Sequence, residues 1–274
     1  MTPPSLRLGA HTLIALDDGE GPFFSPRATA FPDASAAQWA DADAFDPGAV
    51  DAEGRWVLRF RAFAIRSERG VTLVDAGIGP ADSLAAAWAP VPGRLPESLA
   101  EAGVDPAEVS TVVLTHLHSD HVGWAVVGAE RRPYFPNAEY LLQRDEADAI
   151  ESINPSLEGS LLAPLRDAGQ LRLLDGDTAL STGERVVATP GHTPGHQSVL
   201  VEAGRETAAV TGDLLVHAIQ LRNPGLAYAH EMDPGEARRS RERILGADGA
   251  LHLATPHLTA PFTRHAGGDP SPIG

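Results

Sequence analysis

The sequence predicts an α/β (α+β) fold in which mixed β-sheets are covered by helices on their outer faces. Two observations lead to this prediction: the strand-like runs outnumber the helical ones, and several pairs of runs are separated by the short turns that are typical of hairpins. The 274 residues are enough to bury a full core, and no linker divides them. We therefore expect a single domain over residues 1–274.

In the N-terminal half, the patterns predict two hairpins joined by an irregular segment. Alternating or β-branched runs at 6–8 and 12–16 predict the first hairpin, and runs at 56–67 and 71–74 predict the second, which ends at Asp75-Ala-Gly. Residues 20–54 hold four prolines among aromatic residues, which predicts an irregular loop with a short helix at 34–40. This loop either covers a binding site or packs against the core.

Further along the chain, the same criteria predict alternating helices and strands. We expect helices at 80–88, 96–102, 144–150, 160–168 and 234–245, with a further helix start at 105–108. We expect strands at 111–114, 139–143, 171–174, 185–189, 198–202, 207–211 and 250–254. The tail from 267 to 274 is expected to be flexible.

Composition excludes several classes of function. The chain has 21 Lys and Arg against 37 Asp and Glu, a net charge of −16, which disfavours nucleic acid and anionic membrane surfaces as partners and leaves a small-molecule substrate. Arginines 238, 239, 241 and 243 form a local basic cluster, which we interpret as a solvated helix face. No apolar run reaches the ~20 residues of a membrane span and the N-terminus lacks a signal pattern, so we expect a cytoplasmic protein, with a homodimer as one form of assembly.

The segment from Thr115 to Trp124 is the densest in metal-ligand chemistry. It places His116, His118, Asp120 and His121 within six positions. Imidazole nitrogen and carboxylate oxygen suit zinc, iron or manganese. Since the chain has no cysteine, a metal must be held by His, Asp or Glu.

Four predicted strands end in a similar way. Each ends at a threonine (Thr115, Thr189, Thr211 and Thr255), followed one to three residues later by His116, His192, Asp213 and His257. A ligand just after a strand end is held by a rigid sheet and still points into a cleft. If these ends lie side by side, seven ligands meet, which suits two metal ions ~3.5–4 Å apart. The seven are His116, His118, Asp120, His121, His192, Asp213 and His257.

These motifs resemble those of the metallo-β-lactamase superfamily. The resemblance rests on Thr-His116-Leu-His118-Ser-Asp120-His121, Thr-Pro-Gly-His192-Thr-Pro-Gly-His196, Thr-Gly-Asp213, Ala-Thr-Pro-His257 and Leu-Val-Asp75-Ala-Gly, and it extends from about residue 6 to 264. It implies an αββα four-layer sandwich with the metals at one edge of the two sheets. It also implies that His116, His118 and His192 hold one metal, that Asp120, His121 and His257 hold the other, and that Asp213 bridges them.

The chemistry expected of such a site is hydrolysis. A hydroxide held between two cations is available at neutral pH because coordination lowers the pKa of water, to ~7 on zinc. It can attack an ester, lactone or phosphotriester. We assign catalytic roles to Asp213 and to Asp120, which could also accept or return a proton. The expected cofactors are two divalent ions, most simply Zn²⁺, with iron or manganese as alternatives.

Other polar residues receive supporting roles or none. We prefer His257 to His252 as a ligand because His252 lies inside a predicted strand. His196 is assigned to support of the ligands or to loop packing, and Asp75 to orienting an imidazole or to capping a turn. His217 and Gln220 either line the pocket or are plain loop polarity. We assign no site role to histidines 11, 230 and 265.

The substrate is less constrained by the sequence. The segments 212–220 and 254–262 are similar to the branch of organophosphate hydrolases and esterases. Acyl-homoserine lactonases usually carry a tyrosine three residues after the bridging aspartate, where this chain has Val216. Glyoxalase II-like thioesterases, a mononuclear-iron oxidoreductase such as a persulfide dioxygenase, and a non-catalytic metal-binding regulator of the same fold are the remaining alternatives.

Overall fold

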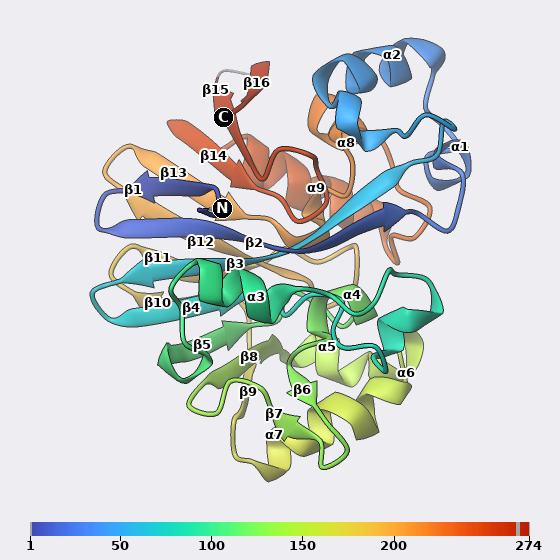
Figure 1. Ribbon diagram of the computed structural model, residues 1–274. Coiled ribbons are helices and arrows are strands. Elements are labelled where there is room, and N and C mark those ends of the chain that lie inside the picture. The colour runs from blue at the N-terminus through green and yellow to red at the C-terminus, as the bar shows by residue number, and fades with distance from the viewer. Residues whose placement is uncertain (1, 267–268, 274) are drawn as a thin grey trace.

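Two seven-stranded β-sheets form the centre of the computed structural model, which describes residues 2–266 and 269–273 (Figure 1). The first sheet contains, in spatial order, β1 (Ser5–Leu8), β2 (His11–Pro22), β3 (Val57–Ser67), β4 (Gly70–Val74), β5 (Val109–Val113), β8 (Glu139–Gln143) and β9 (Leu171–Leu174). The second contains β10 (Thr178–Ser181), β11 (Glu184–Ala188), β12 (Gln197–Ala203), β13 (Glu206–Val210), β14 (Ala250–Ala254), β15 (Phe262–Ala266) and β16 (Asp269–Pro272). Both sheets combine parallel and antiparallel pairs, as the hairpin count predicts.

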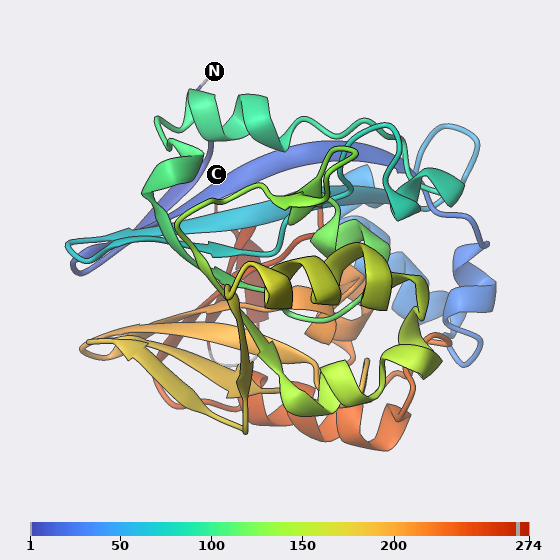
Figure 2. The same ribbon diagram turned by 90° about the horizontal axis from the view of Figure 1, so that it is seen from below.

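The sheets face each other and helices cover their outer faces (Figure 2). Helix α3 (Leu95–Glu101) lies outside the first sheet and α9 (Pro234–Leu245) outside the second. Successive side chains of a strand point to opposite faces of the sheet and so enter different cores. In β5, Val113 belongs to the core between the sheets, and Val112 belongs to the outer core under α3. A third core joins the outer face of the second sheet to α9. The expected αββα order of layers is confirmed.

The remaining helices are short. They are α1 (Arg27–Ala30), α2 (Ala36–Phe45), α4 (Ser119–Val122), α5 (Arg144–Asp148), α6 (Ile150–Ile153), α7 (Ala163–Asp167) and α8 (Ala218–Arg222). One of them, α7, contributes Leu165 to the outer core of the first sheet. Short helical turns η1 (Pro47–Ala49), η2 (Leu84–Ala87), η3 (Pro106–Glu108), η4 (Glu158–Leu162) and η5 (Gly212–Leu214) and a small ribbon, β6 (Val126–Val127) with β7 (Arg132–Pro133), complete the described elements. No helix in the described part of the chain is long and apolar enough to cross a membrane.

Several predicted elements have the predicted bounds, and others differ for identifiable reasons. The strands at 139–143, 171–174 and 250–254 and the helix at 234–245 agree residue for residue. The helix expected at 80–88 is only the turn η2, the one at 144–150 is split into α5 and α6, and the one at 160–168 begins earlier, at η4. The strands β10, β15 and β16 and the helix α8 were not predicted from the sequence.

The first hairpin is longer than predicted because Asp17-Asp18-Gly19 is a bulge rather than a turn. Strand β2 shifts register between Asp17 and Gly19 and continues to Pro22. At this bulge Asp18 is buried, and its carboxylate accepts hydrogen bonds from the backbone N–H groups of Ile78 and Leu95, at 2.5 and 2.6 Å. The triplet Asp17-Asp18-Gly19 therefore forms a bulge within β2 and does not end the strand.

Two segments expected to be irregular contain regular structure. Residues 20–54 include the end of β2, α1, α2 and η1, and Ser35 closes a capping box at the start of α2. Within this segment Phe31 is buried in the outer core of the second sheet. In the tail expected to be flexible, β16 pairs with β15, while residues 267, 268 and 274 lie outside the described residues.

Candidate metal centre

The ends of β5, β11, β13 and β14 lie together at one edge of the sandwich, and the seven predicted ligands meet there. Two groups of side chains could each hold a metal ion. The first contains His116, His118, His192 and Asp213, and the second contains Asp120, His121 and His257; within each group the ligand atoms all lie within 4.8 Å of one another. Six of these seven residues are buried, and His118 is partly exposed to the cavity. Since strands from both sheets supply them, the site joins the two sheets.

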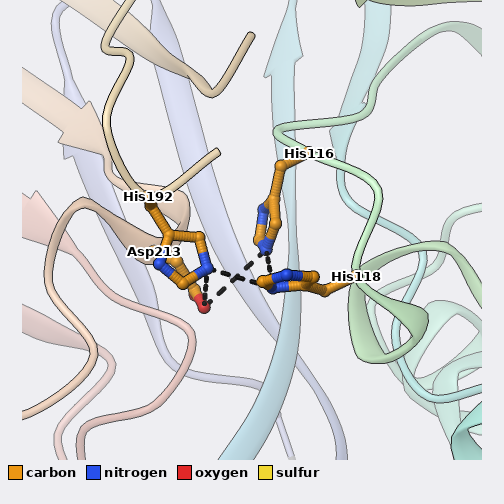
Figure 3. A group of neighbouring side chains, drawn as sticks. All are labelled: His116, His118, His192 and Asp213. Atoms are coloured by element: carbon orange, nitrogen blue, oxygen red, sulfur yellow. Dashed lines mark hydrogen bonds and ion pairs between the residues drawn. The ribbon is translucent and has the colours of Figure 1, made fainter. Parts of the chain in front are cut away.

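In the first group, three imidazole nitrogens converge on one point (Figure 3). His118 Nδ1 lies 3.0 Å from His116 Nε2 and also 3.0 Å from His192 Nε2. A neutral ring nitrogen donates one proton at most, so these three atoms cannot all be satisfied by one another. Converging lone pairs are what a cation with nitrogen ligands requires.

Asp213 faces both groups at once. Its Oδ2 lies 3.2 Å from His192 Nε2 and 3.8 Å from His116 Nε2, whereas its Oδ1 lies 2.9 Å from His257 Nε2 and 3.2 Å from His121 Nε2. One oxygen therefore points to each group. This is the geometry of a carboxylate that could bridge two metal ions.

The second group is rich in negative charge. Asp120 Oδ2 lies 3.4 Å from His121 Nε2 and 3.7 Å from His257 Nε2. Together with Asp75 and Asp213, it places three carboxylates around the single buried imidazole of His121. Neither His121 Nε2 nor Asp213 Oδ1 has a hydrogen-bond partner among the described residues. Buried charge in excess, with unpartnered ligand atoms, fits a bound cation.

Hydrogen bonds on the far side of the rings fix which nitrogen faces the site. Asp75, in a left-handed backbone conformation (φ 64°), accepts hydrogen bonds from Thr115 N, Thr115 Oγ1 and His121 Nδ1 at 2.8, 2.9 and 2.8 Å. Because the Thr115 hydroxyl donates to Asp75, it accepts from His116 Nδ1 at 3.0 Å. His257 Nδ1 donates to the Arg59 carbonyl at 2.7 Å. In all three rings Nε2 keeps its lone pair toward the site.

His196 supports the ligand loops without facing the first group as a ligand. Its Nε2 accepts a hydrogen bond from Asp213 N at 3.0 Å, and its Nδ1 lies 2.8 Å from Thr189 Oγ1. Burial lowers the pKa of His196 to about 3, so the ring stays neutral and Nε2 remains an acceptor. Of the two roles that the sequence left open, support of a ligand is therefore the one that the contacts describe.

Sequence reasoning missed Glu146, which ties the two halves of the first group together. Its side chain is buried, and Oε1 accepts from Leu117 N at 2.8 Å while Oε2 accepts from Gly195 N at 2.9 Å. One carboxylate thus joins the loop after β5 to the loop after β11. Its position in the acidic first turn of α5 resembles ordinary surface charge, so the sequence carried no signal for it.

The pKa values of the site follow from burial and from the neighbouring charges. Burial, followed by the charges of neighbouring imidazoles, lowers the pKa of His116 and His118 well below the usual value. Burial also lowers the pKa of His121, but the Asp120 and Asp213 carboxylates outweigh it and the pKa is raised well above the usual value. Burial raises the pKa of Asp213, yet the surrounding imidazoles hold it well below the usual range. The neutral imidazoles of His116 and His118 and the ionised carboxylate of Asp213 are in the protonation states of metal ligands. The raised pKa of His121 instead reflects the excess of negative charge around this ring, which a bound cation would balance.

A cavity of about 200 Å³ opens onto the ligands. Aromatic and apolar side chains line it together with the candidate ligands and with Ser119, Asn154 and His230, and none of the described residues that line it is Lys or Arg. The lining consists of Phe23, Phe24, Trp56, Leu58, Trp88, His118, Ser119, Asp120, Asn154, His192, Asp213, Val216, Tyr228, His230 and His257. A wall of this kind suits an uncharged substrate with apolar parts.

The sequence left His217 and Gln220 open between lining the pocket and plain loop polarity, and neither residue lines the cavity. The His217 side chain caps α8 by accepting from Ile219 N at 3.0 Å. Gln220 is buried, accepts from Val216 N at 3.1 Å and donates to Glu231 at 2.9 Å. Neither lines the cavity, so they are not pocket residues. His230, which was assigned no site role, lines the cavity with Tyr228 instead.

Curated proteins are similar in sequence to parts of this chain. An N-acyl homoserine lactonase of Bacillus sp is 33% identical over 109 residues, which are 40% of this chain and 39% of that protein. Metallo-beta-lactamase domain-containing protein 1 of Mus musculus is 34% identical over 196 residues, 71% of this chain and 61% of that protein. The matched region is thus well under half the length of the lactonase.

Solved structures superpose over nearly the whole chain. The dizinc quorum-quenching lactonase AidC has a TM-score of 0.78 at 23% identity, covering 98% of this chain and 96% of its own. The hydrolase AbOPH of the beta lactamase superfamily has a TM-score of 0.77 at 25% identity, covering 100% and 98%. The sequence model of the metallo-beta-lactamase superfamily matches residues 61–257, well over half of the 274 residues. The chain belongs to the metallo-β-lactamase superfamily.

Proposed function

We propose that this chain is a binuclear metal-dependent hydrolase that cleaves an ester, lactone or phosphotriester bond in a small, uncharged molecule. The observation that carries the proposal is Asp213, whose two carboxylate oxygens point to two adjacent ligand groups at the floor of the aromatic cavity. We assign His116, His118 and His192 to one ion, Asp120, His121 and His257 to the other, and Asp213 to both.

Two divalent cations bound there would act as Lewis acids and lower the pKa of a coordinated water to ~7, the value known for zinc. The chain's own residues prepare that chemistry. Asp75, Thr115 and the Arg59 carbonyl hold ligand rings with Nε2 inward. Asp120 lies at the cavity wall, where its carboxylate is placed to accept a proton from a substrate or to return one. The cavity walls keep bulk water from the reacting group.

Zinc is the proposed metal because the donors are imidazole and carboxylate and because AidC, which shares the fold, is a dizinc enzyme. N-acyl homoserine lactones form a second candidate class of substrate, which the lactonase relatives favour. A glutathione thioester is less well supported, since an anionic tripeptide would meet no Lys or Arg among the described lining residues. The single-domain organisation, the cytoplasmic location and a homodimeric state remain predictions.

The test combines metal analysis with a substrate panel on protein purified without added metal. We expect two equivalents of zinc and hydrolysis of an uncharged aryl ester, an N-acyl homoserine lactone or a phosphotriester, with a negatively charged thioester hydrolysed least. His257→Asn should lose one metal equivalent and at least 10²-fold in kcat/KM. The matched control is His252→Asn, because His252 lies within β14, away from both ligand groups, and this variant should behave as wild type.

Three results would overturn the proposal. These are a single iron with oxygen consumption, full activity of His257→Asn, and no hydrolysis across the panel by protein that carries both metals. The first would point to the oxidoreductase alternative. The last would point to the regulatory alternative.

A further inference from the structure

We propose that the hydroxyl of Tyr228 donates a hydrogen bond to the substrate oxygen that gains negative charge during hydrolysis. This inference rests on the proposed function and adds a catalytic residue to it. In the reaction, a water oxygen bonds to the acyl carbon, the bond from that carbon to the leaving oxygen breaks, the leaving oxygen takes up a proton, and the acid is released as a carboxylate and a proton. Tyr228 keeps its own O–H throughout.

The ring of Tyr228 lies directly against a proposed metal ligand. It stacks on the His192 imidazole with ring centroids 6.1 Å apart and an interplanar angle of 10°. Both residues line the cavity together with Asp213. A substrate whose reacting group reaches the ligands would therefore share the cavity with the phenol.

The hydroxyl of Tyr228 is available to a ligand. It forms no hydrogen bond with any of the described residues. Some polar atoms of the described residues are completely shielded from solvent and have no partner, and the Tyr228 hydroxyl is not one of them. Tyr140 shows the contrast, because its buried hydroxyl donates to the Ala125 carbonyl at 3.0 Å and accepts from Phe135 N at 3.2 Å. Buried tyrosines usually satisfy the O–H in this way. Since Tyr228 lines the cavity, a ligand bound there can supply the acceptor that its hydroxyl lacks.

A buried ion pair holds the backbone of Tyr228 in place. Tyr228 N donates to Glu231 Oε2 at 3.2 Å, while Glu231 Oε1 accepts from Arg241 and from Gln220. Arg241 is 1% exposed and also donates to the carbonyls of Pro224 and Leu226 at 2.8 and 3.2 Å. The segment that carries the phenol is thus fixed at several points. A donor that is already positioned costs no reorganisation when charge develops.

Apolar rings surround the phenol and increase the value of its hydrogen bond. Phe31, Trp56 and Phe23 lie with ring centroids 5.3, 6.3 and 6.5 Å from that of Tyr228. A hydrogen bond to developing charge is worth more where water is excluded. Loss of one such donor typically costs 10²–10³ in kcat, and we expect a loss on the order of 10² here.

The test compares Tyr228→Phe with Tyr134→Phe in the zinc-loaded full-length protein. Tyr228→Phe keeps the ring against His192 and removes only the hydroxyl. Tyr134 packs on Trp124 and Phe135 and does not line the cavity, so its variant is the matched control. We expect Tyr228→Phe to bind two zinc equivalents as the wild type does, with kcat about 10²-fold lower and KM changed by less than about threefold. Tyr134→Phe should match the wild type in all three measurements.

A second measurement does not depend on turnover. A monophenyl phosphonate ester carries tetrahedral oxygens where an attacked ester would develop them, and its binding is followed by titration calorimetry. We expect Tyr228→Phe to bind it at least about tenfold more weakly than the wild type and Tyr134→Phe to bind it equally well. The calorimetry separates the two proposals. If the wild type binds the phosphonate through Tyr228 but hydrolyses no substrate, the proposed function is overturned and the Tyr228 contact is supported.

The Tyr228 contact itself is overturned by any of three results. They are unchanged phosphonate affinity in Tyr228→Phe, a wild type that does not bind the phosphonate, and a loss of activity in Tyr228→Phe that follows a loss of zinc. The third result would mean that Tyr228 acts only by holding the His192 imidazole in position for the metal. If phosphonate affinity is unchanged in Tyr228→Phe and the wild type is active, the proposed function still stands.

Discussion

Replacing Asp75 by Asn should weaken metal binding at the site without replacing any candidate ligand. Asn has the same shape and is among the residues that best tolerate a positive φ, so the left-handed backbone at 75 adds no strain. The amide oxygen must stay toward Thr115 N, because an NH₂ group there would face another donor. The amide NH₂ then replaces Oδ2 and points at His121 Nδ1 and the Thr115 hydroxyl.

Replacing Oδ2 by an NH₂ group shifts the ring protons of His121 and His116 onto Nε2, the nitrogen that faces the metal site. His121 must now accept at Nδ1, so that its proton shifts to Nε2 and the lone pair toward the site is lost. The Thr115 hydroxyl, no longer able to donate to a carboxylate, donates to His116 Nδ1 and drives the same change there. The loss of one hydrogen bond to a charged group, ~1.5–3 kcal/mol, corresponds to about 10–150-fold in affinity.

The assay is zinc retention against a competing chelator of known affinity. We expect Asp75→Asn to bind the ion of the Asp120, His121 and His257 group about 10–100-fold more weakly, the range known for residues that orient metal ligands. Binding of the ion of the other group should weaken as well, because the change at Thr115 also shifts the proton of His116. The control is Asp167→Asn, an exposed aspartate of α7 remote from the site. Two zinc equivalents held by Asp75→Asn with wild-type affinity would refute the reasoning.

Three further predictions concern the frame around the site. Glu146→Gln leaves one of the two buried N–H groups facing an amide NH₂, so it should lower the free energy of unfolding by about 1–3 kcal/mol in a urea titration. An unchanged midpoint would contradict the idea that this carboxylate joins the two loops. Arg241→Met should destabilise by about 3–5 kcal/mol because it strands the buried Glu231 charge, and the double variant with Glu231→Gln should cost less than the two single changes together. Removal of metal by a chelator should lower the thermal midpoint, and zinc at 1,000 times its Kd should restore ~4.1 kcal/mol; equal midpoints with and without zinc would argue against bound metal.

The candidate ligands could be predicted because they follow strand ends. Short β-branched runs such as 111–114 are recognisable from local sequence, and the residue types after them are unusual enough to mark the site. His116, His192, Asp213 and His257 therefore meet as the strand-end pattern predicts. The sandwich order itself came from the family resemblance, since local patterns do not tell which strands share a sheet.

The supporting residues were not predictable because their roles depend on distant contacts. Glu146 meets Leu117 and Gly195 only after three separate segments have packed together. Local sequence left His217 open between lining the pocket and plain loop polarity; in the structure its side chain caps the start of α8, and Tyr228 lines the cavity. The bulge at Asp18 had the composition of a turn, and tertiary hydrogen bonds decided otherwise.

The arrangement of the ligands across the two sheets links stability to activity. Each group takes residues that follow β5 of the first sheet, such as His118 and Asp120, and residues that follow strands of the second sheet, such as His192 and His257. A cation bound in either group would therefore crosslink the sheets, and it would bind only when they are correctly stacked. Its binding free energy adds to folding for the same reason. Variants such as Glu146→Gln that loosen the loops should then weaken both metal affinity and stability, whereas Tyr228→Phe should lower turnover and leave both unchanged.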